Sequence, residues 1–363
     1  MRGKILSLLI TGATLCVATL VAAAAPDEDT VGYRLDPSWP KMPPGVYIGT
    51  LPPFPTPAER AAAAAARERD SSGDFAKQFA AEPRQPGVGG LAIDLQDHIY
   101  VFNRGAKPVM IFDREGHLLR AGADQVINGK KIDPNAVHSG AVDRQGNVWV
   151  IEREHHRIVK LNPTLDTFLM QLGVTDQPGT DATHLNLPSG MAVLKSGNIV
   201  VTDGYGNNRV VLYDPHGKFI KQIGKGAGGP NDKGNGPGEW SLPHKLAVDA
   251  DEHLYVCEET NGRIQVLDRN LNFLRILPNM GWVPWDFAIA RRGDTGYGFV
   301  ADHEHERVVK ISLTDGHILA AWGKAGRGPG EFDWIHAVVE DSKGAVYAGD
   351  TYGQRVQKFL PAP

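Results

Sequence analysis

The sequence predicts an all-β fold, a six-bladed β-propeller, from three observations. A unit of roughly 40–50 residues recurs along most of the chain, and each copy reads as strand, turn, strand, polar turn, strand. The 363 residues are enough for a large core, and the 42 glycines suit the many turns of all-β repeats. Because one such unit cannot bury both of its faces alone, neighbouring copies must stack, and a closed ring of blades is expected.

The clearest copy begins at residues 241–249 and continues through residues 254–268. Other aligned copies lie at residues 136–161, 187–214 and 334–359, with looser copies at 87–113 and 283–313. The sixth copy ends at Phe359 with almost no chain left, so it is one strand short. Residues 31–39 alternate like a strand outside the repeats, so we expect them to complete the last blade and close the ring.

The N-terminal residues resemble a secretory signal. Residues 1–4, which include Arg2 and Lys4, precede an apolar run at 5–24 and small residues before Pro26, which predicts cleavage near residue 24 or 25. The apolar core is short for a retained membrane span, and the mature chain is expected in the periplasm or outside the cell. The predicted segments are the signal peptide (1–25), the closing strand, linker and helix (26–86), and the propeller (87–363).

The predicted helix follows a proline-rich linker at residues 40–57. Thr56-Pro-Ala-Glu59 is a capping box with proline at the first helical position, and it opens an alanine-rich stretch at residues 58–69. This helix either covers one mouth of the propeller or remains a solvated connector.

Composition limits the partners of the mature chain. Loss of Arg2 and Lys4 with the signal moves the formal charge from −4 to −6, and no basic stripe is available for nucleic acid. Cys16 follows Leu15 in the signal, which is unlike a lipoprotein signal, and Cys257 is expected to be a buried structural thiol. We therefore expect a monomer with a small-molecule or peptide substrate and no membrane contact after cleavage.

The candidate metal-binding residues lie at one aligned position of the repeat, which we call the histidine column. Five places before the Asp position of each first strand, with a shifted register in the last blade, stand Gly89, His138, Ser189, His244, Trp285 and His336. First strands line the channel, so the histidines of blades two, four and six should point inward about 120° apart. Three neutral nitrogens with one open position suit a catalytic zinc, although iron and manganese remain open. The other ten histidines show no such order and are expected at the surface or around the site.

Four segments carry a resemblance to a known family. They are Val-Thr-Asp-Gly-Tyr-Gly-Asn-Asn-Arg at residues 201–209, Gly-Lys-Phe-Ile-Lys-Gln-Ile-Gly at 217–224, Pro-Gly-Glu-Trp-Ser-Leu-Pro-His at 237–244 and Asn-Gly-Arg-Ile-Gln at 261–265. These segments closely resemble the peptidyl-α-hydroxyglycine α-amidating lyase domain of peptide-amidating enzymes, a six-bladed NHL-type propeller. The resemblance spans roughly residues 87 to 359 and implies a free-standing bacterial relative without the monooxygenase domain.

The resemblance implies a reaction and the residues that perform it. A peptidyl-α-hydroxyglycine is split into a peptide amide and glyoxylate. The zinc ligands of the family match His138, His244 and His336, its tyrosine base matches Tyr205, and an arginine of its first blade matches Arg104. Zinc would act as a Lewis acid on the substrate's oxygens while the base removes the α-hydroxyl proton.

A tyrosine with a reference pKa near 10 needs a nearby cation to act as a base at neutral pH. Arg104 is the candidate for that cation, since both residues should face the same mouth of the ring. The alternatives are that Tyr205 packs in a turn and that Arg104 pairs with a neighbouring carboxylate.

Two departures from the family pattern bear on the substrate and on calcium. Glu259 stands where the family's second arginine holds a substrate carboxylate, and it would repel that group. Arg153 shares the repeat column of Arg104 and Glu259, so it either offsets this loss or pairs with a neighbouring glutamate, Glu152 or Glu154. Ala337 replaces the family's calcium-binding Asp, which would leave only backbone carbonyls such as those of Leu91 and Gly140, so bound calcium is not expected.

Three functions therefore compete. The first is a zinc lyase acting on an α-hydroxyglycine-like carbinolamide, and the second is a zinc enzyme with a different substrate. The third is a binding or scaffolding NHL propeller in which the metal is structural or absent. Metal analysis separates the third from the others, and glyoxylate release separates the first two.

Overall fold

The computed structural model describes residues 32–49, 86–127, 129–226, 228–229, 231–291 and 296–362. The predicted signal peptide at residues 1–25 and the predicted helix at residues 58–69 lie outside the described residues. Within the described residues, no helix has the length and apolar character needed to cross a bilayer.

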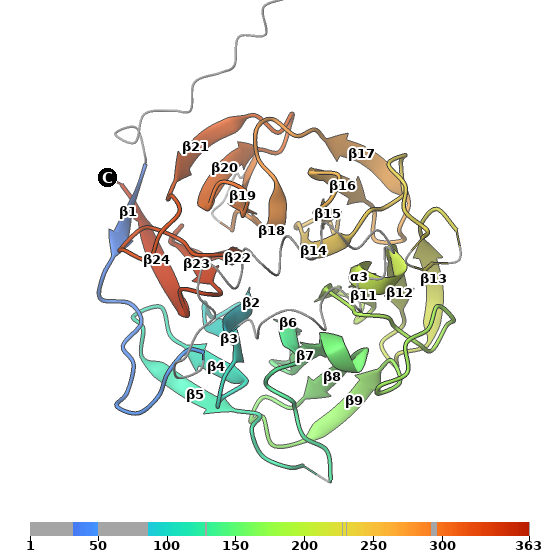
Figure 1. The fold of residues 1–363 in the computed structure, drawn as a ribbon, viewed down its shortest axis with the longest axis horizontal. Helices are drawn as coiled ribbons and strands as arrows, with labels where there is room; N and C mark the ends of the chain where they lie inside the picture. Colours follow the sequence, from blue (N-terminus) through green and yellow to red (C-terminus); the bar gives the residue numbers. More distant parts are fainter. Residues whose placement is uncertain are drawn as a thin grey trace, which may run out of the picture.

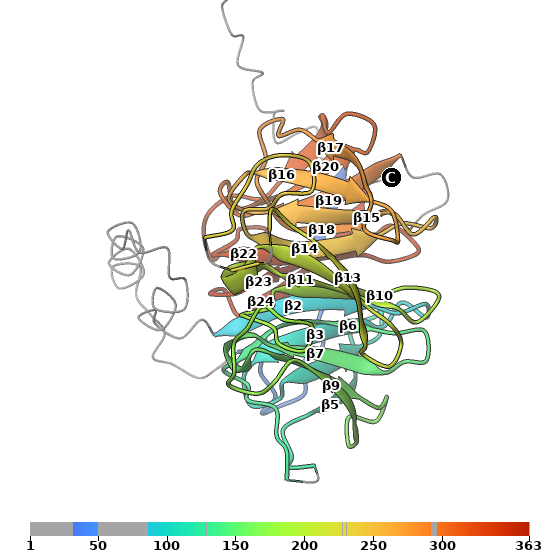
Figure 2. The same ribbon diagram turned by 90° about the vertical axis from the view of Figure 1, so that its right-hand side faces the viewer.

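Six four-stranded sheets surround a central channel, which confirms the predicted six-bladed propeller (Figure 1). The first strand of every blade contacts the first strands of its two neighbours, so these six strands form the wall of the channel. Seen edge-on, the ring is thinner than it is wide (Figure 2).

The strands of the first three blades are given from the channel outward. Blade one contains β2 (Gly87–Ile93), β3 (Ile99–Arg104), β4 (Val109–Phe112) and β5 (Leu118–Gly122). Blade two contains β6 (Val137–Val142), β7 (Val148–Glu152), β8 (Arg157–Leu161) and β9 (Phe168–Leu172). Blade three contains β10 (Gly190–Val193), β11 (Ile199–Asp203), β12 (Arg209–Tyr213) and β13 (Phe219–Ile223).

The other three blades repeat this order, and two short helical turns interrupt blades two and three. Blade four contains β14 (Pro243–Val248), β15 (Leu254–Glu258), β16 (Arg263–Leu267) and β17 (Phe273–Leu277). Blade five contains β18 (Pro284–Ile289), β19 (Tyr297–Asp302), β20 (Arg307–Ser312) and β21 (Ile318–Trp322). Blade six contains β22 (Ile335–Glu340), β23 (Val346–Asp350), β24 (Arg355–Pro361) and β1 (Tyr33–Asp36). The helical turns are η2 (Arg153–His155) and α3 (Gly204–Asn207).

In blades two and six, the turn that follows the first strand depends on local side-chain chemistry. In blade two the Asp143 carboxylate accepts hydrogen bonds from the backbone N–H groups of Gln145 and Asn147, at 3.0 and 2.9 Å. Gly146 then adopts φ +78°, a conformation that glycine reaches without a steric cost. Asp341 and Gly344 repeat the pattern in blade six, where φ is +87°. These turns reverse the chain between strands of the same blade.

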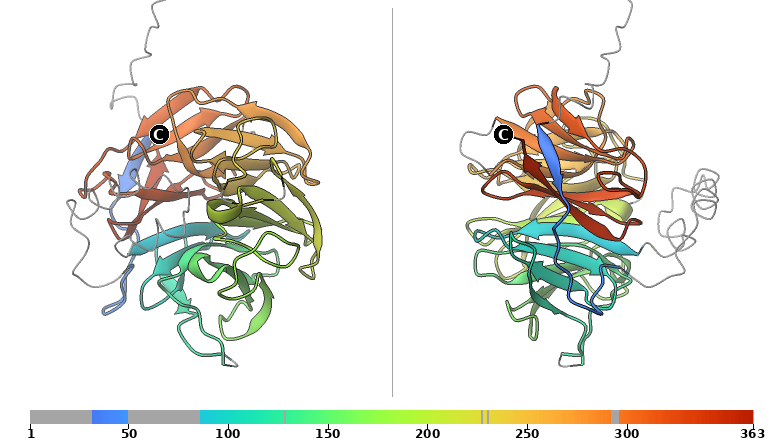
Figure 3. Two further views of the ribbon diagram at one scale, coloured as in Figure 1. Left: turned by 45° about the vertical axis from the view of Figure 1, so that its right-hand side comes forward. Right: turned by 90° about the vertical axis from the view of Figure 1, so that its left-hand side faces the viewer.

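The N-terminal strand closes the ring as predicted. β1 pairs antiparallel with β24, so the last strand of the chain is covered by the first (Figure 3). Tyr33 stacks on Trp322 of blade five at a centroid distance of 4.4 Å, and Trp39 packs on Phe112 of blade one and Tyr347 of blade six. The segment thus ties together three adjacent blades and removes an open sheet edge.

The core is divided among the contacts between neighbouring blades. Buried residues gather in six large clusters, each containing side chains from two adjacent blades. For example, Phe102 and Val109 of blade one pack with Val148 and Val150 of blade two. Cys257 is fully buried in the cluster between blades four and five, as expected of a structural thiol. Each blade therefore depends on its neighbours for burial of its faces.

Candidate metal centre

Three β-bulges turn histidines into the channel. The register between first and second strands skips His138 in blade two, His336 in blade six, and both His244 and Lys245 in blade four. A bulged residue is left out of the ladder, which lets its side chain leave the pleat direction. The propeller thus aims these imidazoles at the channel axis from three alternating blades.

The three imidazoles converge. One ring nitrogen of each can be chosen so that all three lie within 4.8 Å of one another, and all three residues are buried. The ring centroids are separated by 5.1 Å (His138 and His244), 5.1 Å (His138 and His336) and 5.2 Å (His244 and His336). The rings are nearly perpendicular in every pair, so the arrangement has approximate threefold symmetry.

The blades between the histidine blades orient the imidazoles. Nδ1 of His138 donates to the carbonyl of Ser189 at 2.9 Å, and Nδ1 of His244 donates to the carbonyl of Trp285 at 2.6 Å. Nδ1 of His336 donates to the carbonyl of Gly89 at 2.7 Å. Because a carbonyl can only accept, each Nδ1 carries the hydrogen and each Nε2 presents a lone pair.

These three carbonyls belong to the other members of the histidine column, and sequence reasoning missed their role. Their signal was the alternation itself, since histidine and non-histidine residues occupy the same position in successive blades. Gly89 is also required sterically, because a Cβ there would lie 2.6 Å from the carbonyl oxygen of His138.

The donor set fits a divalent cation. Burial in the channel lowers the pKa of all three imidazoles well below the ordinary value, so they are neutral. The Tyr205 hydroxyl lies 3.2 Å from Nε2 of His138 and 2.8 Å from Nε2 of His244. The Tyr205 hydroxyl has one proton and can donate it to only one of these two imidazole nitrogens. The buried lone pairs on the two nitrogens therefore outnumber the protons that this hydroxyl can supply. Three imidazole nitrogens are ligands that zinc accepts.

Tyr205 reaches the centre from α3, the helical turn that follows β11. The side chain is 3% exposed, and the Arg153 guanidinium lies over its ring at 4.8 Å from the centroid. Burial raises the pKa of Tyr205 and the charge of Glu259 raises it further, while Arg153 and Arg104 lower it in part. Arg104 thus acts on the pKa of Tyr205 in the expected direction, but Arg153 is the cation in contact with the ring, and desolvation outweighs both arginines.

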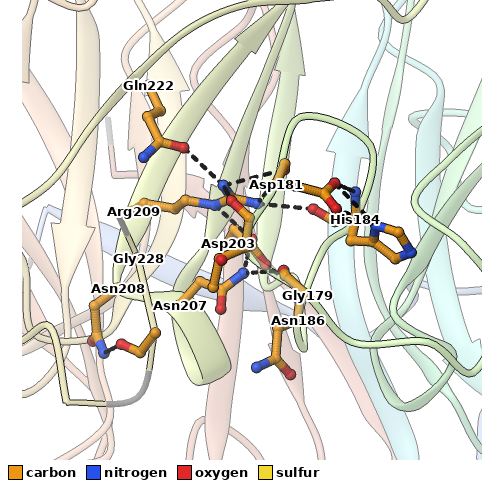
Figure 4. A network of polar contacts seen from close by, with 12 residues as sticks. Gly179, Asp181, His184, Asn186, Asp203, Asn207, Asn208, Arg209, Gln222 and Gly228 are labelled. Carbon is orange, nitrogen blue, oxygen red and sulfur yellow. Dashed lines mark hydrogen bonds and ion pairs between the residues drawn. The ribbon is translucent and has the colours of Figure 1, made fainter. Parts of the chain in front are cut away.

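A buried polar network holds α3 in place (Figure 4). The Asp203 carboxylate accepts hydrogen bonds from Arg209 Nε at 2.9 Å, from the Asn207 amide at 2.6 Å and from the Asn186 N–H at 2.8 Å. Arg209 also donates to the carbonyl of His184 and to the side chain of Gln222. Because both ends of α3 are attached to this network, the turn presents Tyr205 from a rigid support.

Arg104 and Arg153 both act on Tyr205 through their charges, and Arg153 lies over its ring. Arg104 is buried and its Nε donates to the carbonyl of Val137 at 2.7 Å, and burial together with Arg153 lowers its pKa to about 10. Arg153 pairs with Glu154 through two nitrogens, at 2.8 and 2.5 Å. The neighbouring Glu152 pairs with Arg157 instead. Arg153 therefore forms the expected ion pair with Glu154 and also lies over the ring of Tyr205.

The position expected for calcium is different in character. Ala337 is fully buried, and Lys245 fills the equivalent position of the repeat in blade four. The Lys245 ammonium donates to the carbonyl of Gly89 at 3.1 Å and is itself buried. Ala337 therefore offers no charged ligand for calcium at this position.

Aromatic side chains flank the centre, and sequence reasoning did not anticipate them. The Trp285 ring lies 5.5 Å from that of His244 and 5.6 Å from that of His336. His303 packs between Trp285 and Trp334 at centroid distances of 4.1 and 4.2 Å. One of the histidines without a place in the column thus lies close to the centre, while others, such as His117 and His317, pair with aspartates at the surface.

The fold and the centre define a class of protein, a six-bladed propeller of NHL repeats with three channel histidines. The family described as "NHL repeat" matches residues 185–217 and 241–267. The chain is an NHL-repeat propeller related to the peptidyl-α-hydroxyglycine α-amidating lyases, which confirms the resemblance.

Two curated relatives carry this relationship. The peptidyl-glycine alpha-amidating monooxygenase of Mus musculus is 30% identical over 330 residues, which cover 80% of this chain and 32% of the mouse protein. A probable peptidyl-alpha-hydroxyglycine alpha-amidating lyase of Caenorhabditis elegans is 27% identical over 202 residues, covering 51% of this chain and 56% of that protein. The chain thus spans about a third of the length of the mouse relative.

Solved structures share the fold. A streptogramin B lyase superposes with a TM-score of 0.51 at 16% identity, covering 74% of this chain and 92% of that structure. At this level of identity the likeness establishes the propeller architecture alone.

Proposed function

We propose that this protein is a metal-dependent lyase that cleaves a peptidyl-α-hydroxyglycine, or a similar carbinolamide, into an amide and glyoxylate. The observation that carries the proposal is the meeting of three neutral imidazoles and the Tyr205 hydroxyl in one buried centre. The printed names of two lyase relatives, from Caenorhabditis elegans and Drosophila melanogaster, support the same reaction class.

His138, His244 and His336 would hold a divalent metal, for which zinc is our candidate, through their Nε2 atoms. When bound, such an ion supplies Lewis-acid polarisation of the substrate's oxygens. The residues of this chain position the substrate and move a proton. Bound calcium is not part of the proposal, because Ala337 offers no charged ligand.

Tyr205 is the proposed base. As a phenolate it would take the α-hydroxyl proton, while the electrons of that O–H bond form the new carbonyl of glyoxylate. The carbon–nitrogen bond breaks in the same step, its electrons pass to the nitrogen, and the departing amide nitrogen takes the proton back from the Tyr205 hydroxyl. Arg153 and Arg104 favour the phenolate, whereas burial and Glu259 oppose it. The balance of these charges should set the rate at neutral pH.

Arg104 and Arg153 are also the candidates to hold a substrate carboxylate. Glu259 adds a negative charge to the same region, since its charge acts on Tyr205. This observation favours a second candidate, a zinc propeller enzyme whose substrate lacks a free carboxylate. A non-catalytic binding propeller remains the outcome if neither metal nor glyoxylate is detected.

We further propose that the chain is exported as a monomer, with a signal peptide at residues 1–25, a closing segment at 26–86 and the propeller at 87–363. The apolar run at residues 5–24 supports export to the periplasm or beyond. Mass spectrometry of the secreted chain would locate the cleavage site.

Metal analysis tests the centre directly. We expect purified mature protein to hold about one zinc per chain, as the three-imidazole centre requires. His244→Ala should lose most of that zinc, and His303→Ala, which lies nearby but outside the column, should keep it. Equal zinc in wild type and in a His138/His244/His336 triple alanine variant would refute the centre.

Glyoxylate release tests the reaction. We expect slow release from a peptidyl-α-hydroxyglycine that stops when zinc is removed by a chelator and returns when zinc is restored. Zinc binding without any release would favour the enzyme with a different substrate.

A further inference from the structure

The channel opens at its second mouth into a cavity that the proposed reaction does not use. Each first strand begins near the level of the histidines and runs toward a turn at the opposite end of the channel. A cavity of about 780 Å³ opens there and is lined by residues of all six strands. None of the three histidines lines this cavity.

Small and β-branched residues shape the wall of this cavity. Five of the six strands place an alanine at one level of the wall: Ala92, Ala141, Ala192, Ala247 and Ala288. The next residue along the same five strands is isoleucine or valine, and each of these is only partly buried. The alanines keep the cavity wide, and the branched side chains give it an apolar surface that water solvates poorly.

Asp286 lies at the floor of the cavity. The residue is 7% exposed, and its carboxylate accepts hydrogen bonds from the N–H groups of Phe287 at 2.8 Å and Val338 at 3.2 Å. Within the described part of the chain, no cationic side chain forms a direct ion pair with it. Lys245 acts on Asp286 through its charge, but it lies outside the lining and donates to the carbonyl of Gly89.

A buried carboxylate that no cation touches is costly to maintain. Burial raises the pKa of Asp286 to about 6, with Lys245 opposing the rise, so the group is largely ionised at neutral pH. The carboxylate therefore has capacity for a charged partner that enters from the cavity.

The charges of the side chains that line the cavity decide whether a cation or an anion is the favoured ligand. The lining contains seven carboxylates and three basic side chains, so its potential favours cations even with Lys245 behind the floor. Carboxylates at the rim are engaged in turns, as Asp143 is with Asn147, so Asp286 at the floor is the carboxylate to which we assign the ligand.

We propose that this second mouth binds a small organic ammonium ion with an apolar body. Its head group donates to the Asp286 carboxylate, and its hydrocarbon part lies against the alanine and valine wall. The combination explains why a cavity with an apolar wall ends at a desolvated negative charge. This site is separate from the histidine centre and is independent of the proposed lyase activity.

Calorimetric titration of the full mature protein with three probes of equal chain length tests the proposal. We expect n-hexylammonium to bind more tightly than 1-hexanol, and hexanoate to bind least. Asp286→Asn keeps the shape of the floor, and it should weaken n-hexylammonium about tenfold or more while leaving 1-hexanol unchanged. Ala192→Met should weaken both probes, because it fills the cavity without touching the floor.

The histidine centre provides the control. The His138/His244/His336 triple alanine variant should bind n-hexylammonium as wild type does. Equal affinity in wild type and Asp286→Asn, loss of binding in the triple variant alone, or no binding by wild type would each overturn the proposal. Should Asp286→Asn fail to fold, unchanged binding by Ala192→Met would overturn it as well.

Discussion

Tyr205 is the residue on which the proposed chemistry depends most. Tyr205→Phe keeps the ring beneath Arg153 and removes only the hydroxyl, so the zinc content should stay the same. Glyoxylate release should fall about 10²- to 10⁴-fold, the usual contribution of a general base. Tyr213→Phe is the matched control, because Tyr213 lies in the same blade and its buried hydroxyl has no hydrogen-bond partner among the described residues. Similar activity in both variants would remove Tyr205 from the mechanism.

Glu259 should determine how well the site binds a substrate that carries a free carboxylate. Losing one charge-assisted contact with a carboxylate costs about 1.5–3 kcal/mol, or roughly ten- to a hundredfold in binding. Glu259→Gln removes the repulsion and Glu259→Arg adds an attraction, so kcat/KM for a peptidyl-α-hydroxyglycine should rise in that order, mainly through KM. The comparison is made at low substrate concentration. No gain in either variant would mean that Arg153 already holds the carboxylate or that the site binds another group.

At the scale of elements, five blades repeat one ion pair between the end of the second strand and the start of the third. The pairs are Glu152–Arg157, Asp203–Arg209, Glu258–Arg263, Asp302–Arg307 and Asp350–Arg355. In blade three both side chains are fully buried, and the pair brackets α3. The ion pair that stabilises a turn in the other four blades therefore also positions Tyr205, the proposed base, in blade three.

Removing one partner of that pair should be costly. Arg209→Met leaves the Asp203 carboxylate buried without its cation, so the free energy of unfolding should fall by about 3–5 kcal/mol. Arg355→Met should cost less, because Arg355 is 25% exposed and water already screens its charge in the native protein. Denaturant unfolding of the two variants provides the measurement. Equal losses would show that burial does not control the strength of this repeated pair.

At the scale of the whole molecule, closure of the ring holds the six blades together. Deleting residues 26–40 from the mature chain removes β1 and Trp39, so β24 becomes an open edge and the melting temperature should fall strongly, with aggregation. Trp39→Ala alone should cost about 3–5 kcal/mol, as for other buried aromatic side chains. Tyr47→Ala in the same segment is the control, because Tyr47 is 58% exposed. A truncated chain that melts like the mature protein would contradict the closure.

The sequence by itself determined the propeller architecture and the repeat position at which the three histidines lie. Repeats fix the number of blades, and an incomplete sixth copy with a spare N-terminal strand fixes how the ring closes. His138, His244 and His336 could be found because a propeller places equivalent residues of successive blades at the same height in the channel. The aligned repeat does not include the outer strands β5, β9, β13, β17 and β21, since each is mostly only partly buried and carries a weaker apolar pattern.

Only the tertiary structure decided how these residues act on one another. His336 is oriented by the carbonyl of Gly89, a residue 247 positions away along the chain. The pKa of Tyr205 rises because burial outweighs two arginines, and no spacing along the chain reports desolvation. The cavity above Asp286 likewise exists only where six strands meet. The repeat specifies which positions face the channel, whereas hydrogen-bond partners, burial and empty volume arise from contacts between blades that the local sequence does not encode.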